Sequence, residues 1–108
     1  MKAKFLHVGM PITNKKEGME YVDAFKVWVS NPDDYDFAIE YLKYEEGTPF
    51  PEVLHRNPHV CYEVADMQPY LEEAEQVLFG PVSLSDTMDF AYVMWDGTIL
   101  ELQAPKKD

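Results

Sequence analysis

Four side chains able to bind a metal ion occur at matching places in the two halves of the sequence. His7 lies in an apolar stretch that opens the first half, and Glu40 lies between apolar residues near its end; His59 and Glu101 repeat this arrangement in the second half. Neutral imidazoles and carboxylates together suit a divalent first-row metal, with one or two positions left for water or substrate. The sequence therefore predicts one four-ligand site, which nickel, zinc, iron, manganese or cobalt would suit.

Such a site also predicts a kind of reaction. A metal ion of this class polarises a carbonyl or enediolate oxygen, and a carboxylate that can leave the metal can act as a base toward a neighbouring carbon acid. We therefore expect Glu101 or Glu40 to be catalytic as well as a ligand. One residue would then serve both roles.

Strands are expected to carry the first two ligands. Residues 4–12, 24–30 and 36–44 are rich in apolar, β-branched and aromatic side chains. A polar run at 13–18 should end the first of these strands, and a turn or a short helical piece should follow it. Residues 45–58 contain several turn-forming residues, namely Gly47, Pro49, Pro51, Asn57 and Pro58, which predict an irregular connection.

The second half predicts strand, helix, strand, strand, strand. Strands are expected at 59–64, 77–84, 90–95 and 98–103, and the only convincing helix at 67–76. Pro81 cannot donate to a ladder, so its strand should lie at a sheet edge or contain a bulge. Two halves with this shared order of elements suggest an internal duplication.

Alternation along the strands separates two faces. His59 should share a face with Cys61 and Glu63, and Glu101 with Ile99 and Gln103, whereas Leu100 and Leu102 should point the other way. The helix should pack against the apolar face. The polar set would then line the opposite, concave side of the sheet.

Composition limits the classes of partner. The chain has 108 residues, 46% of them hydrophobic, and a net charge of −11, which indicates one domain and disfavours nucleic acid or an anionic membrane surface as a partner. A single cysteine, Cys61, cannot form an internal disulfide, and no apolar run approaches membrane-spanning length. The expected protein is soluble and cytoplasmic and binds a small molecule.

These motifs, in this order, resemble the vicinal oxygen chelate superfamily, which has the glyoxalase, bleomycin-resistance and extradiol dioxygenase fold. The matching segments are His7-Val8-Gly9, Ala38-Ile39-Glu40, Pro58-His59-Val60 and the closing strand with Asp96-Gly97-Thr98-Ile99-Leu100-Glu101-Leu102. The resemblance implies an α+β fold of two βαβββ-type modules, at 1–48 and 58–105, joined by the Pro-rich connection into a cupped mixed sheet around the metal. The helix of the first module would be shortened or missing. The resemblance also implies metal ligands at His7, Glu40, His59 and Glu101, a glyoxalase-like lyase or isomerase, and a homodimer.

Three further residues are expected to line the ligand pocket, namely Cys61, Tyr44 and Trp95. The reaction predicted from the ligands acts on a small α-oxygenated carbonyl compound. An alternative is a metal-free, drug-sequestering protein of the same fold, whose cup holds a cationic or aromatic molecule; the negative net charge favours it. A third option is an accessory domain that acts only through association.

Overall fold

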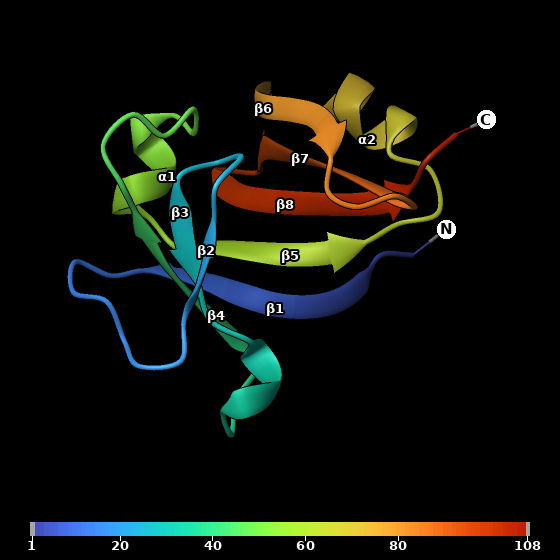
Figure 1. The fold of residues 1–108 in the computed structure, drawn as a ribbon. Coiled ribbons are helices and arrows are strands. Elements are labelled where there is room, and N and C mark those ends of the chain that lie inside the picture. The colour runs from blue at the N-terminus through green and yellow to red at the C-terminus, as the bar shows by residue number, and fades with distance from the viewer. Residues whose placement is uncertain (1, 108) are drawn as a thin grey trace. The chain divides into compact units, whose positions relative to one another are not determined.

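The computed structural model describes residues 2–107, which form a mixed α/β structure of eight strands and a few short helices (Figure 1). The strands are β1 (Lys4–Pro11), β2 (Glu20–Val22), β3 (Val27–Val29), β4 (Ile39–Tyr44), β5 (His59–Glu63), β6 (Gln76–Ser83), β7 (Met88–Trp95) and β8 (Thr98–Pro105). The helices are α1 (Glu52–Arg56), α2 (Gln68–Glu73) and the 3-10 turn η1 (Pro32–Asp34). None of the helices within residues 2–107 has the length and apolar character needed to cross a bilayer.

Neighbouring strands follow the orders β2-β3-β4-β1 and β5-β8-β7-β6. β1 pairs with β4, and β5 with β8, in parallel. The pairs β2/β3, β3/β4, β6/β7 and β7/β8 are antiparallel. The predicted mixed sheet with helices is therefore confirmed, whereas the cupped shape and the two βαβββ modules stay predictions.

Two compact units make up the chain, one formed by residues 7–59 and the other by residues 1–6 together with 60–108. We call them the 7–59 unit and the 60–108 unit.

In the 7–59 unit, strands β2, β3 and β4 form an antiparallel meander, and β4 also pairs in parallel with β1. After the polar run, where a turn or a short helical piece was expected, the chain instead forms the short strand β2 and then a turn at 23–26. The irregular connection expected at 45–58 contains the five-residue helix α1, whose Leu54 is fully buried.

In the 60–108 unit, α2 covers part of one face of the sheet. Val64, Ala91, Val93, Leu102 and Ala104 form a buried apolar cluster with Met67, and the α2 residues Tyr70 and Leu71 pack against it. The prediction that the helix packs on the face of the sheet that carries Leu100 and Leu102 is confirmed. Pro81 lies in β6, the edge strand of the sheet, next to a register shift, as expected.

Candidate metal centre

His7 and Glu40 come together because β1 and β4 run in parallel. The register places Gly9 beside Glu40, and His7 lies two residues before Gly9 on the same face of β1. The His7 Nε2 and Glu40 Oε1 atoms are 3.4 Å apart. The His7 side chain is 9% exposed and the Glu40 side chain 20% exposed, so this pair is largely withdrawn from water.

The ring of His59 lies over Gly9. A β-carbon built on Gly9 would lie 2.1 Å from His59 Cε1 and 2.3 Å from its Nε2, so the imidazole occupies the space that any larger side chain would fill. His59 is 1% exposed, and its ring centroid is 6.4 Å from that of His7. Gly9 is therefore what lets the second imidazole approach the first.

Sequence reasoning missed this role of Gly9. An isolated glycine inside a strand pattern is a known sign of close approach by another group, and that signal was present. What the sequence did not show is which side chain makes the approach.

Three candidate ligands thus belong to the 7–59 unit alone. One ligand atom from each of His7, Glu40 and His59 lies within 4.8 Å of the others. Two imidazoles and one carboxylate in such a cluster are a donor set used by divalent iron and zinc, which leave further positions open. The residues present therefore fit a metal ion.

Glu101 belongs to the 60–108 unit, where neighbouring strands hold its carboxylate. It is 5% exposed; Tyr92 Oη donates a hydrogen bond to its Oε1 over 3.4 Å, and Gln103 Nε2 donates to its Oε2 over 3.1 Å. A buried carboxylate needs such donors because burial removes its hydration. The sequence placed Gln103 on the face of Glu101 but assigned neither Gln103 nor Tyr92 a role.

Within the 7–59 unit, the predicted ligands His7, Glu40 and His59 form a group that could hold a metal ion, whereas Glu101, the fourth predicted ligand, belongs to the 60–108 unit. The coarse prediction of a histidine and glutamate metal-binding group is therefore supported by the structure.

The three predicted pocket residues lie in different surroundings. Cys61 is fully buried on β5 and pairs in register with Glu101 on β8, so the two side chains are neighbours on one face. Tyr44 stacks on His55 of α1 with ring centroids 4.3 Å apart and meets Phe50 edge-on. The His55 ring is half-buried, and its Nε2 is 2.9 Å from the Phe50 carbonyl oxygen.

Trp95 lies on the opposite face of the sheet from Glu101. It packs with the buried cluster under α2 and contacts Tyr70 at a centroid distance of 5.9 Å. In the β7/β8 ladder Tyr92 is the partner of Glu101, and alternation turns Trp95 to the other side from Tyr92. Trp95 is therefore not brought together with Glu101.

Glu40 also borders a cavity of about 380 Å³ within the 7–59 unit. Its lining is mostly polar and acidic and is formed by Gly18, Glu20, Val29, Ser30, Asn31, Pro32, Asp34 and Glu40. A small molecule in this cavity would meet the carboxylate of a candidate metal ligand. The acidic lining disfavours an anionic occupant.

Comparison with protein-family models and with curated proteins gives no match for this chain.

Proposed function

We propose that the protein is a metal-dependent, glyoxalase-like lyase or isomerase of the vicinal oxygen chelate type, acting on a small α-oxygenated carbonyl compound. The observation that carries this proposal is the grouping of the His7 and His59 imidazoles with the Glu40 carboxylate within the 7–59 unit. His7 and His59 are nearly buried, and solvated strand residues would have no reason to gather in this way.

The proposed ligands are His7, Glu40, His59 and Glu101, with Glu101 as the fourth. A divalent ion suits this set because it offsets the mutual repulsion of two carboxylates withdrawn from water. When bound, the ion would act as a Lewis acid toward the carbonyl oxygen of the substrate.

Glu40 is the proposed base. Its side chain is 20% exposed and borders the cavity beside β4, so it can reach a substrate there. Its carboxylate would accept a proton from the hydroxyl-bearing carbon next to the carbonyl group. In an isomerase it would return that proton to the former carbonyl carbon, while the hydroxyl proton passes to the former carbonyl oxygen. Glu101 is more deeply buried and is held by two hydrogen bonds, which suits a fixed ligand better than a moving base.

The cavity lining also narrows the proposed substrate. Glu20 and Asp34 lie in the same lining as Glu40, so a neutral hydroxycarbonyl compound is favoured over an anionic one. A homodimer remains part of the proposal, and light scattering with and without metal measures it.

Metal binding is the first test. We expect nickel, zinc or manganese to raise the melting temperature of chelator-dialysed protein by about 10 °C at a hundredfold excess over Kd. His59→Ala should abolish that rise. His55→Ala is the matched control, because His55 stacks on Tyr44 and does not belong to the metal-binding group.

No rise with any of these ions would overturn the enzyme proposal and favour the metal-free binding protein. Catalysis is then tested in deuterium oxide, where proton NMR follows exchange of the α-protons of hydroxyacetone or dihydroxyacetone. Metal-dependent exchange supports the proposed proton transfer. A protein that binds metal but exchanges no α-proton of either compound would contradict it.

A further inference from the structure

An apolar groove lies on the face of the 60–108 unit that carries α2. The helix spans only Gln68–Glu73, and Ala74 already has an extended backbone, whereas the sequence predicted a helix to residue 76. Six helical residues extend for about 9 Å, so α2 leaves part of this face uncovered. The uncovered part forms a groove of about 390 Å³.

Three aromatic side chains dominate the lining of this groove. Tyr62 from β5, Tyr70 from α2 and Trp95 from the end of β7 surround it, and Val60 and Leu100 add aliphatic surface. The Tyr70 and Trp95 rings are 5.9 Å apart and tilted by 50°. Apolar patches of this kind on a protein surface are typical of binding sites.

The charge at the groove is negative. Asp96 lines it and is exposed, and it forms no ion pair within residues 2–107. Glu75 is held at the same turn, because its Oε1 accepts a hydrogen bond from the Gly97 backbone N–H over 2.9 Å. No lysine or arginine belongs to the lining. An occupant with a positive charge would therefore be favoured.

The 7–59 unit contains a similar aromatic pair that is already occupied by a cation. The Tyr21 and Trp28 rings are 5.0 Å apart and tilted by 49°, and Lys15 Nζ lies 4.1 Å from the centroid of the Trp28 ring. The Tyr70 and Trp95 pair has nearly the same tilt but no lysine of the chain in its groove. The chain's own Lys15 thus contacts the aromatic pair of the 7–59 unit, whereas the Tyr70 and Trp95 pair can accept a cation from another molecule.

We propose that this groove binds a small organic cation with apolar substituents, of the quaternary ammonium class. The aromatic faces would attract the positive charge through their quadrupoles, and Asp96 would add a carboxylate at the rim. This site contains none of the metal-binding group and does not depend on the proposed catalysis.

Three probes of similar shape separate the cation effect from simple apolar binding. They are choline, its neutral carbon analogue 3,3-dimethylbutan-1-ol, and the anion 3,3-dimethylbutanoate. The chain has two tryptophans, Trp28 and Trp95, so the two indole N–H signals in a nitrogen-15 NMR spectrum report one unit each. Trp28→Phe assigns them, and the titration is run on the full chain with a chelator present.

We expect choline to shift the Trp95 signal saturably and to leave the Trp28 signal in place. The neutral analogue should bind about threefold to fivefold more weakly and the anion more weakly still. Trp95→Leu should remove choline binding, and Trp28→Leu should not affect it. Asp96→Asn should weaken choline binding by about threefold to fivefold. It should not affect folding, because Asp96 is exposed and asparagine tolerates its φ of 51°.

Equal affinity for choline and its neutral analogue would overturn the proposal, and so would equal losses in Trp95→Leu and Trp28→Leu. A choline affinity that Asp96→Asn leaves unchanged would remove the role of the carboxylate and with it the proposed cation selectivity. Because a chelator is present throughout, failure here is independent of the outcome of the metal titration.

Discussion

The two candidate glutamate ligands are held in different ways. In the 7–59 unit, Glu40 contacts His7 over 3.4 Å, keeps 20% of its side chain exposed and borders a cavity. In the 60–108 unit, Glu101 is 5% exposed and accepts hydrogen bonds from Tyr92 and Gln103. Two residues of the same type thus occupy one accessible and one fixed position.

This difference suggests a division of roles. A base must move between a ligand and a proton, so it needs room and few competing hydrogen bonds, whereas a structural ligand is improved by partners that fix its orientation. Sequence spacing treats Glu40 and Glu101 as equivalent. Their surroundings do not.

The largest expected effect comes from exchanging each glutamate for glutamine. With saturating metal, Glu40→Gln should lower the rate of metal-dependent α-proton exchange by about a thousandfold, because it removes the proposed base. Glu101→Gln should mainly weaken metal binding and keep exchange within about tenfold once metal saturates. NMR exchange rates and calorimetric metal affinities check both, and a greater rate loss in Glu101→Gln would reverse the assignment.

The next largest effect is expected for Gly9→Ala, which tests whether the close contact with Gly9 positions His59. Gly9→Ala would place a methyl group 2.1 Å from the present position of His59 Cε1, so the imidazole must move. We expect nickel affinity to fall by about a hundredfold, an effect as large as that of removing an orienting partner of a metal ligand. Calorimetry measures it.

Gly47→Ala is the control for Gly9→Ala. It strains a backbone with φ of 86° and would contact only the Lys26 side chain, whose Cδ is 3.4 Å away, so it alters the same unit without reaching a ligand. Equal losses in the two variants would show that general destabilisation, not displacement of His59, lowers the affinity.

Strand periodicity was sufficient to predict much of the candidate site. Alternation correctly placed Gln103 on the face of Glu101 and Leu102 on the face under α2, because a period of two is set by backbone geometry alone. The strand pair β7 and β8 around Asp96-Gly97 was also predicted correctly, since this dipeptide favours a two-residue turn.

Features that depend on contacts between distant segments could not be predicted. The role of Gly9 depends on the ring of His59, fifty positions along the chain, and no local pattern encodes that approach. Helix α2 is shorter than its apolar spacing suggested, because the chain turns extended at Ala74 to begin β6 at Gln76. Trp95 lies on the face of the sheet opposite Glu101 and packs under α2, and its sequence position could not show this because the sequence alone left open which aromatic residues belong to the core.

A smaller effect is expected from the hydrogen bond that orients Glu101. Gln103→Leu removes the donor to Oε2 while keeping a side chain of similar size, and should lower nickel affinity by about tenfold. Gln68→Leu is the matched control, because Gln68 donates to Glu72 over 3.0 Å in an exposed pair on α2. If both variants bind nickel as the parent does, Glu101 does not need this partner.

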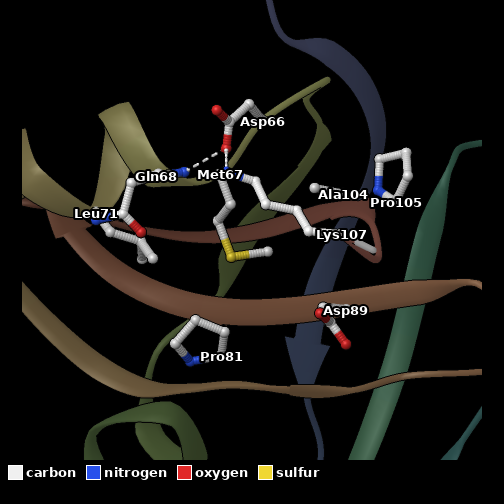
Figure 2. A pocket seen from close by; sticks show the side chains of 9 residues that line it. All are labelled: Asp66, Met67, Gln68, Leu71, Pro81, Asp89, Ala104, Pro105 and Lys107. Carbon is white, nitrogen blue, oxygen red and sulfur yellow. Dashed lines mark hydrogen bonds and ion pairs between the residues drawn. The ribbon is translucent and has the colours of Figure 1, made fainter.

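The smallest effects concern two surface ion pairs, one in each unit. A hydrogen bond from Lys107 holds the pKa of Asp66 below its ordinary value of 3.8, with help from the Gln68 backbone N–H (Figure 2). In the 7–59 unit, Arg56 lowers the pKa of Glu52 in the same way.

Both shifts have the same sign and the same consequence for stability. A carboxyl group whose folded-state pKa is lowered stabilises the fold above its unfolded pKa, and this contribution is lost as the pH falls through the folded value. Lys107→Gln should therefore raise the pKa of Asp66 alone, and Arg56→Gln that of Glu52 alone, in a carbon-13 NMR titration of the carboxyl groups. Exposed pairs contribute little, so neither variant should change nickel affinity, and a change in Lys107→Gln would mean that the surface around α2 influences Glu101.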